Sequence, residues 1–286
     1  DENTREMASP GQMRSNIYNP NIRRLQLSVP GLEIGDILRY RARREVFKTR
    51  VPDTWSDRFL FEGTDPVLHA EFEIDAPAAR PLEKISLSDP VRDTVDHAVT
   101  TNGNRILYRW TGRDIPRMFP EPSMPSRASV VQRVLVSTIP EWEELSRWYW
   151  NLSKPHLDAV TPAMKEKVAE LTAEAAAREE NIRAIFTWVS QNIRYMGITL
   201  EEEAPGYEPH DVDLTFDRGY GVCRDKAALL VAMLRLAGFD AYPVLMMVGP
   251  KKDERVPQPW FNHAIVGVRE PDGLFRLMDP TDENTR

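Results

Sequence analysis

Residues 219–238 read GYGVCRDKAALLVAMLRLAG, and the rest of the chain is best interpreted from this stretch. From Val222 onward the residues favour a helix, until Gly238 stands where a left-handed helix cap is expected. Cys223, the only cysteine in the chain, therefore lies at the start of a predicted helix. The unpaired backbone amides and the helix dipole favour negative charge there. They would stabilise a thiolate at Cys223, provided that the sulfur is not sealed in apolar packing.

A structural role for Cys223 is the alternative, because a lone cysteine among alanines and leucines is more often a small buried residue than a catalyst. Two downstream segments favour the chemical role. Residues 260–268, WFNHAIVGV, are typical of a strand with His263 near its start, and residues 274–280, LFRLMDP, are typical of a strand that ends at Asp279. The four residues EPDG at 270–273 form a turn signal between them.

These two segments predict a hairpin whose register matters for chemistry. If the turn is a three-residue loop with Gly273 in the left-handed conformation, Ile265 faces Asp279. Strand alternation then puts His263 on the same face as Asp279 and makes the two residues diagonal neighbours, within hydrogen-bond reach. A loop with an even number of residues would break this relation. The sequence thus predicts a thiol at a helix N-terminus, an imidazole to take its proton and a carboxylate to orient the imidazole.

Three short motifs together resemble a known family. They are GVCRDKA at 221–227, FNHA at 261–264 and DPT at 279–281, and they look like the Cys, His and Asp motifs of the bacterial transglutaminase-like superfamily. The motifs occur in the family's chain order and at plausible spacing, which is far more specific than any one of them. The resemblance covers roughly the second half of the chain, from about Pro162 to the end.

The resemblance implies roles for individual residues. Cys223 would be the nucleophile, His263 the general base and acid, and Asp279 the orienting carboxylate, within a papain-like α+β core. One departure is Val222, where many relatives carry an aspartate. The resemblance also implies a periplasmic or cell-envelope location. It suggests a peptidase or amidase at least as readily as a crosslinking enzyme.

Three further residues are weaker candidates for the cleft. Trp188 lies in an amphipathic helical pattern, and relatives can use an indole to hold the oxyanion, although a helical tryptophan is more often a core residue. Tyr207 and His210 precede the nucleophile in a position that resembles the loop lining the cleft in relatives. A metal bound by His210, Cys223 and His263 is disfavoured, because the short paired spacings of zinc sites are missing. The sequence therefore predicts no metal and no cofactor.

Length and charge bound the remaining possibilities. With 286 residues, two domains are the default expectation. The net charge of −7 argues against nucleic acid as the partner, and no stretch approaches a membrane span. A protein or peptide substrate is expected, while the oligomeric state stays open. The proposed catalytic Asp279 stands close to residue 286, so the natural polypeptide is expected to continue.

The N-terminal half shows a β pattern with turn markers such as Asn102-Gly103. In one run the alternating residues Leu68, Ala70, Phe72 and Ile74 share a face. The strand-like runs are Arg24–Val29, Ile37–Phe47, Ser56–Phe61, Leu68–Ile74, Leu82–Leu87, Arg105–Trp110 and Val130–Ser137. Short strands at this spacing predict an antiparallel, sandwich-like domain. The segment PGLEIGDIL at 30–38 resembles the signature of a β-rich domain of unknown function that often precedes transglutaminase-like domains.

The expected fold class is α+β: an antiparallel β-sandwich-like domain at 1–139, a helical linker at 140–160 and a transglutaminase-like domain at 161–286. In the linker Trp142, Leu145, Trp148 and Tyr149 fall on one helix face and are expected to join the domains. The expected function is cysteine-dependent acyl transfer on peptide or carboxamide substrates. The alternative is a catalytically silent module of the same fold that binds polypeptide or cell-surface partners.

Overall fold

The computed structural model describes residues 4–8, 17–18, 23–89, 94–174, 177–198 and 206–283. The chain forms two compact units, each assembled from separate segments. We call residues 1–47, 151–244 and 264–286 the cysteine unit, and residues 48–150 and 245–263 the β unit. The two units are defined by compactness alone. The domain boundaries expected from the sequence therefore stay a prediction. In the part of the chain that is described, no helix is long and apolar enough to cross a membrane.

The β unit contains two three-stranded antiparallel sheets. One sheet has the order β4-β9-β6, with β4 at Ser56–Leu60, β9 at Arg133–Ser137 and β6 at Lys84–Ser88. The other has the order β5-β8-β7, with β5 at Val67–Pro77, β8 at Arg105–Ile115 and β7 at Val95–Asn102. The short helix α1, Arg127–Val130, precedes β9.

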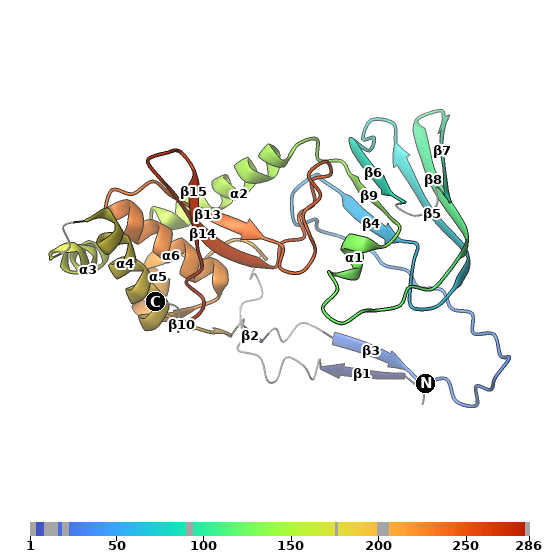
Figure 1. Ribbon diagram of the computed structural model, residues 1–286, viewed down its shortest axis with the longest axis horizontal. Coiled ribbons are helices and arrows are strands. Elements are labelled where there is room, and N and C mark those ends of the chain that lie inside the picture. The colour runs from blue at the N-terminus through green and yellow to red at the C-terminus, as the bar shows by residue number, and fades with distance from the viewer. Residues whose placement is uncertain are drawn as a thin grey trace. The chain divides into compact units, whose positions relative to one another are not determined.

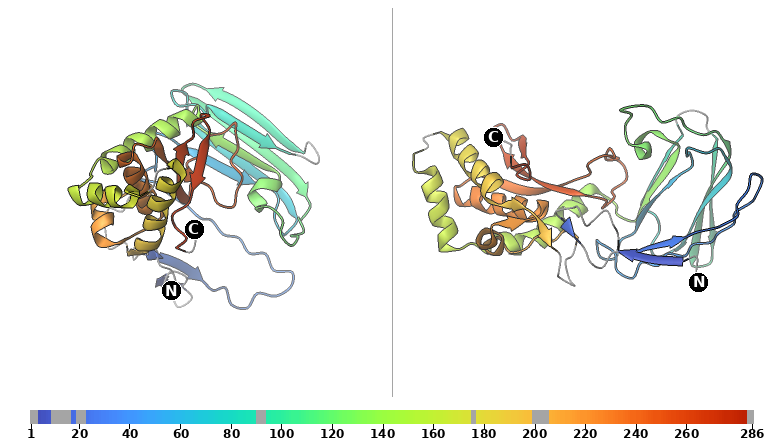
Figure 2. Two further views of the ribbon diagram at one scale, coloured as in Figure 1. Left: turned by 60° about the vertical axis from the view of Figure 1, so that its left-hand side comes forward. Right: turned by 90° about the horizontal axis from the view of Figure 1, so that it is seen from below.

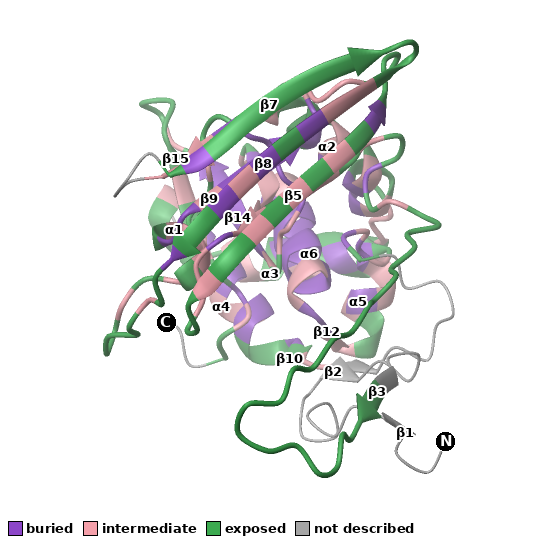
Figure 3. Ribbon diagram, turned by 90° about the vertical axis from the view of Figure 1, so that its right-hand side faces the viewer, coloured by how far each residue is buried: buried purple, intermediate pink, exposed green. Residues whose placement is uncertain are grey.

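Side chains from both sheets share one core, which confirms the sandwich-like architecture. Its buried members are Phe61, Ala76, Val95, Tyr108, Trp110, Ile115, Val134 and Val136. Phe59 on β4 stacks on Phe72 on β5, with their ring centroids 5.1 Å apart. Figure 3 shows the alternation of exposed and covered residues along β5 and β8 that such a two-layer packing requires.

The strand predictions succeeded where the core selects one face and failed where it does not. The run Ile37–Phe47 forms no strand, and its side chains at Ile37 and Phe47 are both 92% exposed. Alternating sequence alone cannot pair a strand without a neighbouring edge. The edge strand β7 escaped prediction because only its first residue, Val95, is buried.

One run followed its predicted face only in part. Ala70, Phe72 and Ile74 pack against the core as predicted, but Leu68 is 80% exposed. The ladder between β5 and β8 omits the pair of Leu68 with Asp114, whose backbone has a φ of 49°. The left-handed residue interrupts the regular pleat, so the alternation cannot be extended to this end of the strand.

Helix α2, Trp142–Leu157, contains the aromatic face expected to join two domains. Within the β unit Trp142, Leu145 and Trp148 pack with Val51, Ile139 and Phe261. The indole Nε1 of Trp142 also donates to the carbonyl oxygen of Asp253 at 3.1 Å. That this aromatic face also joins a second domain stays a prediction.

The cysteine unit is mainly helical and is built around α6. Its helices are α3 at Pro162–Thr172, α4 at Arg178–Asn192, α5 at Val212–Arg218 and α6 at Cys223–Leu236. α6 packs against the other three. The ten consecutive residues from Asp225 to Leu234 are buried, so this helix forms the centre of the unit. The hydroxyl of Thr161 caps α3 by accepting from the backbone N–H of Met164.

The predicted hairpin is present in a three-stranded sheet of order β13-β14-β15. The strands are β13 at Ala241–Met246, β14 at His263–Arg269 and β15 at Phe275–Met278, which Figure 1 labels side by side. The register pairs Val266 with Met278 and Arg269 with Phe275. Gly273 has a φ of 86° and the turn has three residues, so the predicted loop and register are confirmed.

Short pairings complete the cysteine unit. β1 at Thr4–Ala8 and β3 at Arg23–Leu27 form a two-stranded antiparallel ribbon, blue in Figures 1 and 2. β2 at Ile17–Tyr18 pairs in parallel with β11 at Gly197–Ile198. β10 at Arg194–Tyr195 pairs in parallel with β12 at Tyr220–Gly221, which brings the end of α4 beside the residues that lead into Cys223.

Candidate active site

Cys223 is the first residue of α6, as the sequence predicts, and its side chain is half-buried rather than sealed in the core. The preceding residue, Val222, has an extended backbone and forms the N-cap. Its carbonyl oxygen accepts from the backbone N–H groups of Asp225 and Lys226, each at 3.0 Å. The N–H of Cys223 lies in the first turn, where a helix has no internal acceptor for it.

Two glycines shape the chain that leads into Cys223. Gly219 ends α5 with a φ of 69°, the left-handed conformation that glycine adopts without steric cost. A Cβ atom added to Gly221 would lie 2.7 Å from Cβ of Asp225. Only glycine therefore allows the backbone at position 221 to approach α6 so closely.

Asp225 supports the start of α6. The residue is 3% exposed. Oδ2 of its carboxylate accepts from the N–H of Val222 at 3.0 Å, which helps to cap the helix. Oδ1 accepts from the backbone N–H of His210 at 3.0 Å, and Nδ1 of the same histidine lies at 3.1 Å. Burial alone would raise the pKa of Asp225, but the contacts with His210 and the charge of Arg224 outweigh it and lower this pKa.

Tyr195 is a site residue that sequence reasoning missed. It ends the short strand β10 opposite Gly221, and its side chain makes a hydrogen bond with Cys223. Burial raises the pKa of Tyr195 to about 12, and the charges of Cys223 and Asp279 add to the effect. The hydroxyl is therefore a proton donor at any moderate pH, positioned against the sulfur. The only sequence signal was that the predicted helix ran towards Tyr195.

Lys226 is a second residue that was missed. Its side chain is fully buried, and Nζ donates to the carbonyl oxygens of Ser190, at 3.0 Å, and of Ile193. Ser190 belongs to the last turn of α4 and Ile193 is the C-cap of that helix, just before Tyr195 in the chain. Burial lowers the pKa of Lys226 to about 8, against the opposing charges of Glu283 and Asp279. A lysine inside an otherwise apolar helix was the available signal.

Asp279 directly follows β15. Its Oδ1 accepts from the backbone N–H of Thr281 at 3.0 Å and from the Thr281 hydroxyl at 2.7 Å, so the turn fixes the carboxylate. Its charge adds to the rise in the pKa of Tyr195 and partly opposes the lowering of the pKa of Lys226. The cysteine unit thus brings Asp279 into the electrostatic surroundings of the residues around Cys223.

His263 is the first residue of β14 and is half-buried. The residue before it, Asn262, is held firmly: its Oδ1 accepts from the N–H of Val248 at 2.7 Å and its Nδ2 donates to the Val248 carbonyl at 2.9 Å. The backbone N–H of Asn262 donates to the carbonyl of Met246 at 3.0 Å. These bonds define where the strand that carries His263 begins.

The weaker candidates have mixed surroundings. Tyr207 is 8% exposed, and His210 bonds to Asp225. Trp188 packs against Phe216, with ring centroids 5.4 Å apart, and lines a hollow formed by α3 and α4. Roles for these three in binding substrate or an oxyanion stay predictions.

The loop that contains Tyr207 and His210 is tied to the end of α2. His156 contacts Asp211 through Nδ1 at 2.7 Å and Glu208 through Nε2 at 3.0 Å. Burial would lower the pKa of His156, but these two carboxylates outweigh it and raise this pKa. Among the described residues no group of three or more His, Cys, Asp or Glu side chains is arranged to hold a metal ion.

Two family models match the chain. Residues 165–280 match the transglutaminase-like superfamily, and residues 1–119 match a domain of unknown function with solved structure, DUF3857. No curated protein matches the chain. These matches confirm the resemblance seen in the three motifs.

Solved structures show similarity at low identity. A candidate protease from Parabacteroides distasonis ATCC 8503 has a TM-score of 0.69 at 19% identity, covering 98% of this chain and 53% of that one. This chain thus spans about half the length of that protein, and the similarity supports the fold.

Two further structures have lower scores. A candidate cysteine protease from Cytophaga hutchinsonii has a TM-score of 0.33 at 14% identity, covering 80% of this chain and 78% of that one. The periplasmic domain of TgpA from Pseudomonas aeruginosa has a TM-score of 0.32 at 20% identity, covering 79% and 77%. The chain thus contains two matched segments: residues 165–280 resemble the transglutaminase-like superfamily, and residues 1–119 resemble DUF3857.

Proposed function

We propose that the protein catalyses cysteine-dependent acyl transfer on peptide or carboxamide substrates, with Cys223 as the nucleophile. The observation that carries the proposal is the setting of Cys223: a half-buried thiol at the N-terminus of a buried helix, hydrogen-bonded to the side chain of Tyr195. Backbone amides of the first helical turn and a donating hydroxyl are groups that can stabilise negative charge on an attacking sulfur. A merely structural cysteine would need neither.

In this proposal His263 is the general base and acid, and Asp279 orients it. The register of β14 and β15 supports the pair. Continued by one residue beyond Val266 and Met278, it puts Asp279 opposite Ile265, which lies two residues from His263 on the same strand face. A carboxylate there would accept a hydrogen bond from one ring nitrogen and leave the other to face the thiol.

The reaction we propose has two halves. His263 takes the proton of the Cys223 thiol, and the sulfur attacks the carbonyl carbon of the substrate. The N–H of Cys223 has no acceptor within the helix and bonds to the Tyr195 side chain instead; in the reaction it would turn to the resulting oxyanion and stabilise it. Protonated His263 then passes its proton to the leaving nitrogen, and the carbon–nitrogen bond breaks to leave a thioester on Cys223.

Water or an amine would complete the second half. His263 removes a proton from the incoming nucleophile, which attacks the thioester carbonyl and releases Cys223. Water gives hydrolysis, as in a peptidase or amidase. An amine gives transfer, as in a transglutaminase. The protease description of the similar structure from Parabacteroides distasonis favours hydrolysis as the first activity to test.

The test is an activity screen on the whole chain with peptide amides and peptide anilides, measuring released ammonia or amine. Cys223→Ala is the blank, and His263→Ala and Asp279→Asn complete the set. Arg113→Gln, on an exposed position of β8 in the β unit, serves as the matched control. We expect product from the wild type and from Arg113→Gln, and none above background from Cys223→Ala. Product formation that is equal in Cys223→Ala, or absent throughout, would favour a silent binding module instead.

A further inference from the structure

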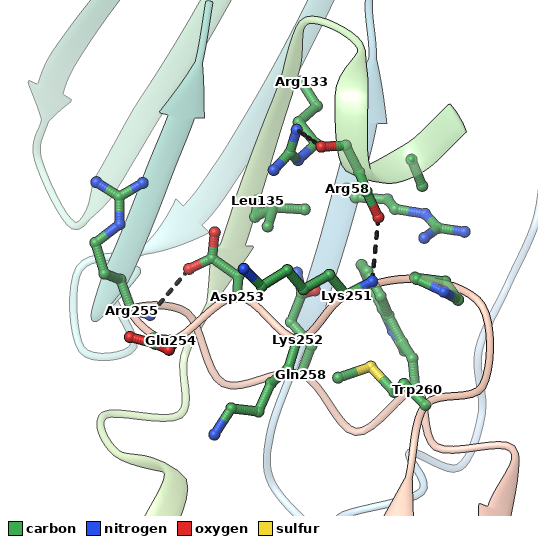
Figure 4. Close-up of a pocket in the computed structure, with 14 residues that line it drawn as sticks. Arg58, Arg133, Leu135, Lys251, Lys252, Asp253, Glu254, Arg255, Gln258 and Trp260 are labelled. Atoms are coloured by element: carbon green, nitrogen blue, oxygen red, sulfur yellow. Dashed lines mark hydrogen bonds between the residues drawn. The ribbon is translucent and has the colours of Figure 1, made fainter. Parts of the chain in front are cut away.

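The β unit contains a cavity of about 390 Å³ that lies entirely within its own two segments. Strands β4 and β9 and the short helix α1 form one wall, and residues 247–260 form the other. Figure 4 shows this second segment crossing in front of the strands that carry Arg58 and Arg133. The volume lies within the range of small-molecule sites, roughly 300 to 1,000 Å³.

The cavity is lined by an excess of positive charge. Five cationic residues contribute to it against the two acidic residues Asp253 and Glu254. The five are Arg58, Arg133, Lys251, Lys252 and Arg255. The excess is notable because the chain as a whole has a net charge of −7. The charged ends of two of the five are directed elsewhere, Lys252 onto the Trp142 ring and Arg255 to the Ser86 hydroxyl. Arg58, Arg133 and Lys251 remain, and a negative charge between them would relieve their mutual repulsion by compensation.

That compensation is not supplied by ion pairs. Within the described parts of the chain, none of the five cations has a carboxylate oxygen within 4.0 Å. Arg133 donates to the carbonyls of Ser129 and Val131, and Arg255 donates to the hydroxyl of Ser86. The partners of Arg133 are neutral carbonyls, so they orient its guanidinium without cancelling its charge. The Ser86 hydroxyl also donates to Oδ2 of Asp253 at 3.5 Å, so Arg255 has this carboxylate one hydroxyl away.

Asp253, the acidic residue that follows Lys252 in the sequence, accepts hydrogen bonds from the backbone of its own loop. Asp253 accepts through Oδ1 from the backbone N–H groups of Arg255, at 2.9 Å, and Val256, at 3.1 Å. Figure 4 shows the bond to Arg255 at the edge of the pocket. Asp253 therefore shapes the loop that presents Lys251 and Lys252.

Aromatic contacts hold two of the cations in place. The guanidinium of Arg58 lies 4.9 Å from the ring centroid of Trp260, and the ammonium of Lys252 lies 4.9 Å from the ring centroid of Trp142. A guanidinium fixed on an aromatic face keeps its N–H edge available for an anion. Trp260, with Leu135 and Met247, also gives the cavity an apolar wall.

We propose that this cavity binds a small organic polyanion through its carboxylate or phosphate groups. A guanidinium group matches the geometry of both kinds of oxyanion, and several cations around one cavity suit a ligand with more than one negative group. The apolar wall would contact the carbon part of the ligand. The site belongs to the β unit and is independent of the proposed chemistry at Cys223.

The experiment is isothermal titration of the whole chain with two probes, citrate for carboxylates and pyrophosphate for phosphates. The variants are Lys251→Ala and Arg58→Ala, with Arg113→Gln as a cation control outside the cavity. We expect saturable binding of at least one probe, weakened about ten-fold or more in each cavity variant and unchanged in Arg113→Gln. Which probe binds more tightly identifies the source of the oxyanion.

Lys251 is exposed on a loop, so its substitution tests binding without threatening the fold. Thermal unfolding without ligand checks that each variant is folded. Binding that is lost equally in Arg113→Gln would reduce the effect to overall charge and overturn the proposal. Absence of saturable binding of both probes to the wild type would also overturn it.

Discussion

Lys226 allows a prediction with a calculable size. Its side chain is fully buried, and burial lowers the pKa of the ammonium from 10.5 to about 8. The folded protein thus releases this proton near pH 8, whereas the unfolded chain holds it to about pH 10.5. Between these values the unfolded state binds more protons, so the free energy of unfolding rises with pH. Below about pH 8 the cost of burying the charge is present in full.

The expected gain follows from the difference in pKa. At about 1.36 kcal/mol per unit, the whole shift corresponds to about 3 kcal/mol. Tyr195 limits the usable range, because its pKa is raised to about 12 and it destabilises the fold above its ordinary value of 10.0. Between about pH 7.5 and pH 10 we therefore expect the cost of burying Lys226 to fall by about 2 kcal/mol, and the free energy of unfolding to rise by the same amount.

The perturbation is Lys226→Met, which keeps a long side chain and removes the titrating group. Urea unfolding followed by helical ellipticity reports mainly on the cysteine unit, where most helices lie. The difference between wild type and variant isolates Lys226 from other groups that titrate in the same range. We expect the rise in stability with pH in the wild type and a much smaller rise in Lys226→Met. Equal slopes in the two proteins would refute the reasoning.

Three further predictions concern the surroundings of Cys223. Tyr195→Phe removes the hydroxyl that bonds to Cys223 and should slow alkylation of the thiol by iodoacetamide about ten-fold at neutral pH, since a hydrogen bond to a charged group contributes roughly 1.5–3 kcal/mol; an unchanged rate would exclude the role. Gly221→Ala should lower the free energy of unfolding by about 1–3 kcal/mol in urea titrations, because the new methyl group would meet Asp225 at 2.7 Å. The raised pKa of His156 means that its stabilising contacts are present in full below about pH 6.5 and are lost as pH rises through the raised value; thermal unfolding at several pH values should show this loss in the wild type and a flatter profile in His156→Gln.

Local sequence was sufficient where one residue type fixes one geometry. Gly273 and the spacing around it predicted the three-residue loop, and the register of β14 and β15 followed. The position of Cys223 at the start of a buried helix followed from the alanines and leucines behind it. These features depend on contacts within a few residues or across one hairpin.

The missed residues depend on contacts between distant segments. Tyr195 reaches Cys223 because the two-residue strands β10 and β12 pair in parallel, a contact too short to leave a pattern in the sequence. Lys226 looked out of place in an apolar helix, but its acceptors belong to α4. His210 was expected to touch substrate, and its bond to Asp225 could not be read from spacing. The wrong strand at 37–47 has the same cause, since alternation does not reveal whether a partner edge exists.

The central claim is that His263 activates Cys223. Because Cys223 is the only cysteine, the rate of alkylation of the whole chain measures its thiolate directly. The measurement is this rate across about pH 5 to pH 10 for the wild type and for His263→Ala. We predict faster alkylation of the wild type than of His263→Ala at neutral pH. Superimposable profiles would contradict the claim.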